Sequence, residues 1–209
     1  NDGKEFVYQK ERDSVLELSD IMDEEGYLKI TMFELRSLFN FNNISEEIRI
    51  KMYPILLGLY DITSNELKRL QADEIIKSEY EKLSKDLNNG SANNTSGVND
   101  LDENSINRIL LNLTQNHPTQ YVQGMADIVS TIYLLYPGQE ALVYNISLKM
   151  FDDLRLRDNF REDQKGITHN LDILSILTEI LMPSLMKKLK EINAENFVYV
   201  YKMFLVLFT

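Results

Sequence analysis

Apolar residues recur every three or four positions through almost the whole chain, and this period restricts the possible folds more than any other feature. The clearest example begins after Ser45, a residue suited to a helix N-cap, and ends near Gly58; its apolar residues are Ile48, Met52, Ile55 and Leu56. No alternating run is long enough to require a β-sheet. The sequence therefore predicts an all-α, multi-helix fold.

Further helices follow from the same period. Ser64 is predicted to cap a charged stretch whose apolar set includes Leu67, Leu70, Ile75 and Ile76. Another helix is expected to open at Asn104-Ser105 and to run through Ile106, Ile109, Leu110 and Leu113. The segments 139–152, 164–181 and 184–208 carry the same spacing, and Pro183 marks a break before the last of them.

One stretch, residues 88–97, has no apolar period and consists of Asn, Gly, Ser, Ala and Thr. Such turn-forming residues are typical of a flexible loop. We therefore expect a lead-in segment at 1–24, a front helical half at 25–87, a polar loop at 88–100 and a back helical half at 101–209. Because residues 206–209 end within an apolar helical pattern, we expect the domain to be incomplete at its C-terminus.

Composition excludes several classes of function. The chain has 22 Lys and Arg against 33 Asp and Glu, a net charge of −11, which argues against nucleic acid as the main partner because phosphate contacts need clustered cations. It has no cysteine, and its two histidines lack metal-ligand spacing, so we expect no metal and no cofactor. No apolar run approaches the roughly 18 residues of a transmembrane helix.

The most specific motif is Tyr-Val-Gln-Gly-Met-Ala-Asp-Ile at 121–128. It resembles a signature of the TBC domain, the all-helical domain of Rab GTPase-activating proteins. Weaker matches to the same family surround it, so that the resemblance spans about residues 25–208; they are Ile48–Gly58 with Tyr53 where Trp is usual, Asn104–Leu110, Asn116–Pro118, Asn159–Gly166 and Tyr201–Phe208. We expect Tyr53 to pack in the core of the front half, against Leu56 or Leu57.

The resemblance implies a mechanism. Hydrolysis of GTP requires a positioned water and stabilisation of charge on the transferring phosphoryl group. TBC domains supply a glutamine finger from Tyr-x-Gln and an arginine finger from Ile-x-x-Asp-x-x-Arg. By this resemblance Gln123 holds the water, while Tyr121, Gly124, Met125 and Asp127 support the motif or contact the GTPase. The competing interpretation makes Gln123 a core glutamine that is hydrogen-bonded to backbone.

The arginine finger is where the sequence departs from the family. No arginine occurs between Arg69 and Arg108. One alignment lays Leu83–Asn89 on the family motif, which keeps Asp86 but places Asn89 at the finger. A second alignment matches Glu79–Leu83 to a segment that normally lies upstream, and the arginine motif is then missing altogether. We interpret Lys85 as a solvated lysine at a helix end and Arg108 as a structural or salt-bridged residue.

Three functions remain open. The chain is an authentic Rab GTPase activator whose arginine motif is absent only from this sequence, a pseudo-GAP that binds a GTPase or a partner subunit without efficient catalysis, or an acidic helical scaffold with no GTPase ligand. We prefer regulation of a Rab-type GTPase, bound in its GTP form, with weak activation. The expected location is cytoplasmic, with recruitment to an organelle membrane through a partner as an option.

Overall fold

A computed structural model describes residues 16–41, 44–88, 100–115, 121 and 123–206, which fall into two compact units, 1–76 and 77–209. Within these residues every regular secondary-structure element is a helix. The only β-type pairings among them are two isolated bridges, Leu16 with Ile44 and Met22 with Leu28. The all-α prediction is confirmed.

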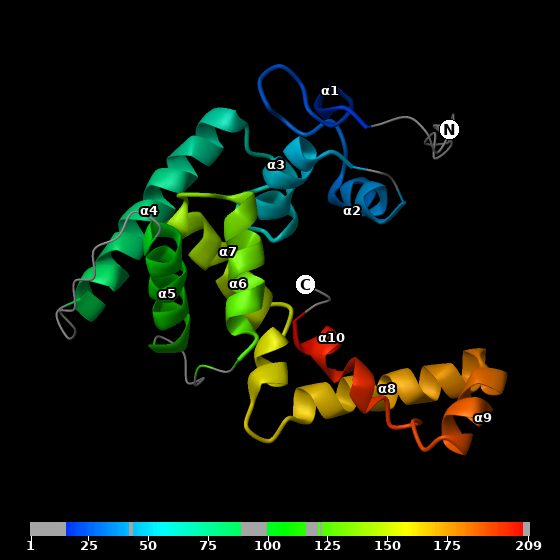
Figure 1. Ribbon diagram of the computed structural model, residues 1–209. Helices are drawn as coiled ribbons and strands as arrows, with labels where there is room; N and C mark the ends of the chain where they lie inside the picture. Colours follow the sequence, from blue (N-terminus) through cyan, green and yellow to red (C-terminus); the bar gives the residue numbers. More distant parts are fainter. Residues whose placement is uncertain (1–15, 42–43, 89–99, 116–120, 122, 207–209) are drawn as a thin grey trace, which may run out of the picture. The chain divides into compact units, whose positions relative to one another are not determined.

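The first unit holds three helices and the start of a fourth, α4, which continues into the second unit (Figure 1). Their bounds are α1 (Leu18–Ile21), α2 (Met32–Phe41), α3 (Glu46–Leu56) and α4 (Glu66–Asn88). The second unit holds the rest: α5 (Asp100–Gln115), α6 (Met125–Leu135), α7 (Glu140–Asp152), the 3₁₀ helix η1 (Leu156–Phe160), α8 (Lys165–Leu181), α9 (Pro183–Glu191), the 3₁₀ helix η2 (Val198–Val200) and α10 (Tyr201–Leu205).

Helix α3 begins as its sequence predicts. The hydroxyl of Ser45 accepts a hydrogen bond from the Ile48 amide at 3.4 Å, and Ile48, Met52 and Ile55 are buried. Pro54 lies inside the helix, which ends at Leu56, two residues before Gly58 adopts a left-handed φ of 71°. Since proline lacks an amide proton, the last turn of α3 has one backbone hydrogen bond fewer.

Tyr53 is half-buried rather than a member of the fully buried core. Its ring packs in a tilted arrangement on Phe39 of α2, with ring centroids 5.8 Å apart. The aromatic residue at this position therefore joins α2 to α3.

The predicted start of α4 is wrong by one residue. Asn65, not Ser64, caps the helix, because the Asn65 side chain accepts from the Lys68 amide at 3.1 Å. Ser64 is buried instead and accepts from the Arg69 guanidinium, Nε to Oγ, at 3.2 Å. The apolar residues Leu67, Leu70 and Ile75 are exposed, so helical spacing alone did not identify a buried face.

Helices α5, α6 and α7 pack against one another and form the core of the second unit (Figure 1). Helix α5 begins at Asp100, four residues before the predicted Asn104. Helix α7 contributes six buried residues, namely Leu142, Val143, Tyr144, Ile146, Ser147 and Phe151. The predicted segments 139–152 and 164–181 agree closely with α7 and α8.

The predicted continuous helix 184–208 is wrong. Pro183 occupies the first turn of α9, where its missing amide proton costs nothing, and the helix ends at Glu191. The chain then turns through Asn193 and Phe197, both with φ of 54°, before η2 and α10. The predicted loop at 88–97 is wrong at Asn88, which is the last residue of α4, and the rest of it lies outside the described residues.

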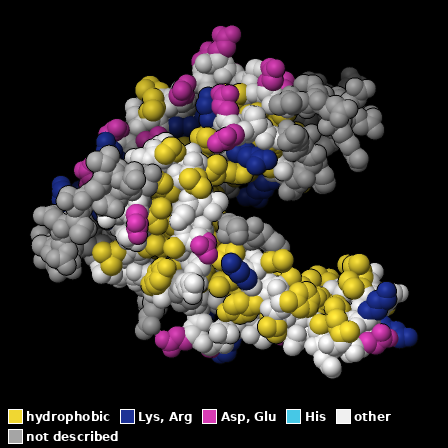
Figure 2. Space-filling model, viewed as in Figure 1, with side chains coloured by type: hydrophobic (Ala, Val, Ile, Leu, Met, Phe, Trp, Pro, Cys, Tyr) yellow, Lys and Arg dark blue, Asp and Glu magenta, His cyan; other side chains and the backbone are white. Residues whose placement is uncertain are grey.

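Much of the apolar surface of α8 and of the start of α9 is exposed, and Figure 2 shows hydrophobic side chains gathered along this part of the molecule. The residues are Ile173, Ile176, Leu177, Ile180, Leu181, Met182 and Leu185. No helix within the described residues is both long and apolar enough to cross a bilayer.

Candidate functional site

Gln123 lies in an exposed turn immediately before α6. The interpretation as a buried core glutamine is therefore wrong. An exposed amide at the start of a helix is free to reach a ligand, whereas a buried one normally has its hydrogen bonds satisfied within the protein.

The turn that carries Gln123 is fixed by the two buried residues that follow it, Gly124 and Met125. Gly124 is buried, has φ of 107°, and forms the N-cap of α6. A Cβ at this position would lie 3.3 Å from side-chain carbons of both Leu205 and Val206, so neither the backbone conformation nor the space favours another residue. Met125 is 2% exposed. The turn is thus fixed while the Gln123 side chain faces outward.

Asp127 and Tyr121 are both exposed. Asp127 lies in the first turn of α6, where a carboxylate interacts favourably with the helix dipole. Tyr121 is 55% exposed and lines a groove beside the turn. The structure thus brings Tyr121, Gln123, Gly124, Met125 and Asp127 to one end of α6.

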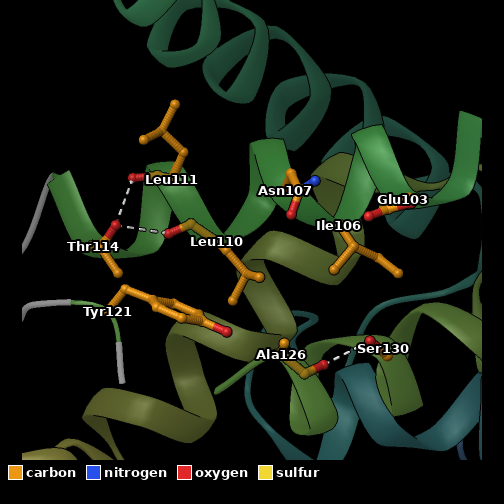
Figure 3. A pocket seen from close by; sticks show the side chains of 9 residues that line it. All are labelled: Glu103, Ile106, Asn107, Leu110, Leu111, Thr114, Tyr121, Ala126 and Ser130. Carbon is orange, nitrogen blue, oxygen red and sulfur yellow. Dashed lines mark hydrogen bonds between the residues drawn. The ribbon is translucent and has the colours of Figure 1, made fainter. Parts of the chain in front are cut away.

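The groove runs between α5 and α6 and has a volume of about 730 Å³. Figure 3 shows its lining, which consists of Glu103, Ile106, Asn107, Leu110, Leu111, Thr114, Tyr121, Ala126 and Ser130. The hydroxyls of Thr114 and Ser130 donate to carbonyls of their own helices, Leu110 O at 2.9 Å and Ala126 O at 2.6 Å. Ile106, Leu110, Leu111 and Ala126 give the groove much apolar surface, and Glu103 and Asn107 add polar groups to its lining.

The second predicted finger lies beyond the end of α4. Lys85 is exposed in the last turn of α4, as predicted for a solvated lysine. Asp86 belongs to the helix, but its side chain lies outside the described residues, and so does Asn89. Of the two predicted finger residues, the structure therefore describes Gln123 and does not describe Asn89.

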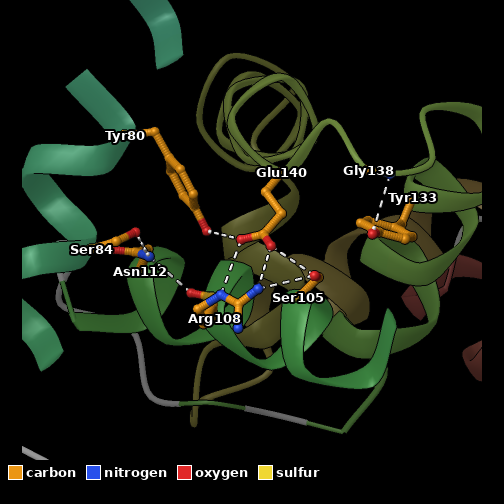
Figure 4. A network of polar contacts seen from close by, with 8 residues as sticks. All are labelled: Tyr80, Ser84, Ser105, Arg108, Asn112, Tyr133, Gly138 and Glu140. Atoms are coloured by element: carbon orange, nitrogen blue, oxygen red, sulfur yellow. Dashed lines mark hydrogen bonds and ion pairs between the residues drawn. The ribbon is translucent and has the colours of Figure 1, made fainter. Parts of the chain in front are cut away.

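Arg108 forms an ion pair with Glu140 (Figure 4), which agrees with the salt-bridged one of the two interpretations of this arginine. The Arg108 Nε donates to Glu140 Oε2 at 3.1 Å, and the Arg108 Nη2 donates to Glu140 Oε1. The hydrogen bonds that Arg108 donates to Glu140 raise the pKa of Arg108. Burial acts to raise the pKa of Glu140, but hydrogen bonds from Arg108 and Ser105 outweigh it and hold that pKa below its ordinary value.

Sequence reasoning did not identify Glu140, Ser105, Tyr80 or Asn112 as members of this network. The Glu140 pairing spans 32 residues, and no local spacing reveals a contact at that separation. The available signal was the position of Glu140 at the start of a predicted helix, where an acidic residue is common for local reasons.

A model of the Rab-GTPase-TBC domain matches residues 46–209. The chain belongs to the Rab-GTPase-TBC domain family. The match begins at the first residue of α3 and includes the turn that carries Gln123. Within the part of the chain that the structure describes, no group of three or more His, Cys, Asp or Glu side chains could hold a metal ion.

Relatives of this TBC chain include fungal proteins named GTPase-activating protein GYP7. The Candida glabrata protein is 23% identical over 241 residues, covering 91% of this chain and 32% of its own length. The Schizosaccharomyces pombe protein is 25% identical over 252 residues, covering 98% of this chain and 33% of its own length. The chain thus spans about a third of the length of these curated relatives.

A solved structure shows the same fold. The crystal structure of the Ypt/Rab-GAP domain of Gyp1p matches with a TM-score of 0.72 at 18% sequence identity. The match covers 90% of this TBC chain and 71% of the Gyp1p chain. The helical arrangement is therefore that of a TBC domain.

Proposed function

We propose that this chain regulates a Rab-type GTPase as a TBC GTPase-activating protein, with Gln123 as its glutamine finger. The observation that carries the proposal is the exposed Gln123 on a turn fixed by buried Gly124 and Met125. Membership of the Rab-GTPase-TBC family and likeness to proteins named GTPase-activating protein support it.

The chemistry suits a glutamine in this position. A side-chain amide has an acceptor oxygen and two donor hydrogens, so one group can orient an attacking water and contact the nucleotide. In GTPase mechanisms a water-positioning glutamine is one of two recurring protein contributions, and an arginine finger is the other. Tyr121 and the apolar groove next to Gln123 offer contact surface to the GTPase.

The arginine contribution is absent or replaced by Asn89. Asparagine is neutral and lacks the five-donor fork of a guanidinium group. An arginine finger is typically worth about 10³–10⁵ in rate, which corresponds to roughly 4–7 kcal/mol of transition-state stabilisation. We therefore propose weak activation, carried by Gln123 alone.

A missing segment is the alternative to a substitution at Asn89. The aligned lengths of the two fungal relatives, 241 and 252 residues, exceed the 209 residues of this chain, so the relatives have residues within the matched region that this chain lacks. Both alternatives lead to the same expectation of weak catalysis.

The second candidate function is a pseudo-GAP that binds a GTPase or a partner subunit without catalysis. The absence of any arginine between Arg69 and Arg108 favours it. In both functions we propose that the partner is a Rab in its GTP form, that the setting is vesicle trafficking in the cytoplasm, and that a partner recruits the chain to an organelle membrane.

Single-turnover GTP hydrolysis by a panel of Rab proteins tests the proposal. We expect a slow but measurable acceleration by the unaltered chain that Gln123→Ala removes. Gln71→Ala, at an exposed position of α4, is the matched control and should leave the rate unchanged. Strong activation that survives Gln123→Ala contradicts the mechanism, and tight GTP-dependent binding without any acceleration favours the pseudo-GAP.

A further inference from the structure

The groove between α5 and α6 has two chemically different ends. Figure 3 shows Thr114 and Tyr121 at one end and Glu103 at the other. Tyr121 is two residues before Gln123, so the first of these ends is the one beside the predicted finger. Glu103 and Thr114 are eleven residues apart in α5, which corresponds to about 16 Å of helix. The groove is therefore long enough to hold an extended part of a partner's surface.

The end beside Gln123 is mainly apolar. Leu111 is 41% exposed and Tyr121 is 55% exposed, so both side chains are accessible to a partner. The hydroxyl of Thr114 donates to the carbonyls of Leu110 and Leu111 at 2.9 and 3.2 Å and is thus satisfied within α5. Since tyrosine is among the residues that contribute most to protein–protein binding, this end is suited to a protein partner.

The opposite end is polar. Glu103 and Asn107 are both exposed and lie four residues apart, so their side chains share one face of α5. Among the described residues, neither side chain has an ion pair or a hydrogen bond, and Glu103 is the one charged member of the lining. A partner that fills the groove therefore meets an unpaired carboxylate at this end.

The distance from Gln123 indicates which partner covers the groove. A standard protein–protein interface buries about 800 Å² on each partner, which is a patch with a radius of roughly 16 Å. A GTPase that brings its nucleotide to Gln123 therefore also covers neighbouring surface of α5 and α6. The groove begins at that point and extends over a comparable length.

We propose that this groove selects the GTPase, and that Glu103, assisted by Asn107, favours a GTPase with a Lys or Arg at the matching position. This inference rests on the proposed function. The apolar end accepts aliphatic or aromatic side chains of the GTPase next to Tyr121, whatever the charge of that GTPase. A charge at the rim of an interface mainly changes partner choice and association rate, so Glu103 is a specificity residue and acts separately from Gln123.

Binding of Rab proteins loaded with a non-hydrolysable GTP analogue is the first test. Glu103→Lys should weaken the tightest Rab complex by about tenfold at low salt, and Glu103→Gln by about threefold. Asn107→Asp adds a second carboxylate and should strengthen the same complex by about threefold. Glu191→Lys, exposed on α9, is the matched control and should leave the affinity unchanged. Affinities for every bound Rab that are insensitive to Glu103→Lys overturn the proposal.

A charge exchange with the GTPase identifies the cation. Each exposed Lys and Arg of the preferred Rab is replaced by Glu in turn, and one replacement should restore binding to the Glu103→Lys variant. Failure of all of them to restore it contradicts a cation opposite Glu103. At the apolar end, Leu111→Ser should weaken all bound Rab proteins by a similar factor, whereas Leu134→Ser, at a 78% exposed position of α6, should not.

Single-turnover GTP hydrolysis separates selection from catalysis. Glu103→Gln should raise the half-saturating concentration about threefold and leave the maximal rate unchanged, whereas Gln123→Ala should lower the maximal rate. A lower maximal rate with unchanged half-saturation in Glu103→Gln contradicts a specificity role. If no Rab binds the parent chain, the proposed function and this inference both fail. If a Rab is activated through Gln123 but is insensitive to Glu103→Lys, this inference alone fails.

Discussion

Helices α7 and α8 have similarly apolar sequences, yet they are buried to very different extents. Six side chains of α7 are buried, whereas α8 buries only Ile167 near its start and Thr178 near its end among the residues described. Ile176 and Ile180 of α8 are 58% and 69% exposed. A helical apolar pattern therefore identifies a helix in both cases, but only for α7 does it also identify the core.

The comparison also shows how α8 is attached. Its first turn packs against η1, where Gly166 approaches the backbone of Asp158 so closely that a Cβ would lie 2.3 Å from the Asp158 carbonyl carbon. The glycine of the Asn159–Gly166 motif is thus explained by a close approach of two backbone segments. Further along α8, Ile173, Ile176 and Leu177 are exposed.

The largest expected effect is in the core, at the C-terminal end of α7. Phe151 is 1% exposed and packs on Phe160 with ring centroids 5.4 Å apart. Phe151→Ala should lower the free energy of unfolding by about 3–5 kcal/mol, whereas Ile176→Ser on α8 should change it by less than about 0.5 kcal/mol. Urea unfolding followed by circular dichroism measures both, and comparable losses would show that α8 is buried like α7.

A smaller effect is expected at the attachment of α8. Gly166→Ala should destabilise the chain by about 1–3 kcal/mol, because the backbone of η1 has to move away from the new methyl group. Thr168→Ala, exposed on the same helix, is the control for the helix propensity of alanine. Melting temperatures compare the two, and a Gly166→Ala variant as stable as the parent would mean that η1 and α8 are not in close contact.

The smallest effect concerns pH and the start of α7. Since the pKa of Glu140 is lowered in the folded chain, its contribution to stability is present above the ordinary carboxyl pKa of 4.5 and is lost as the pH falls through the lower folded value. Glu140→Gln should therefore be less stable than the parent at pH 7, and the difference should shrink in acid. Asp153→Asn, which removes an exposed pair with Lys149, should show little difference at either pH.

The sequence predicted those features of the fold that depend on neighbouring residues. Local rules for helix ends predict the Ser45 cap, the bounds of α7 and α8 and the break at Pro183. These rules could not predict that Leu67 and Leu70 are exposed, because burial depends on tertiary packing. They also could not predict that 184–208 is split, because left-handed turns such as that at Phe197 depend on tertiary packing too.

For the candidate site, the resemblance identified Gln123, and the structure adds its position before α6, its exposure and the fixed turn that carries it. A salt bridge was one of two interpretations of Arg108, but its partner Glu140 and the link to Tyr80 were not predicted, because these contacts join residues 32 and 60 positions apart. The roles of Gln123 and Asn89 remain predictions.

The central claim is that a glutamine finger works here without its arginine. A double-mutant cycle in single-turnover GTP hydrolysis tests it most directly, with the parent chain, Gln123→Ala, Asn89→Arg and the double variant assayed on the same GTP-loaded Rab. We expect weak activation by the parent, a clear increase with Asn89→Arg, and loss of that increase when Gln123 is also replaced. Strong activation by the parent that is insensitive to Gln123→Ala would contradict the account.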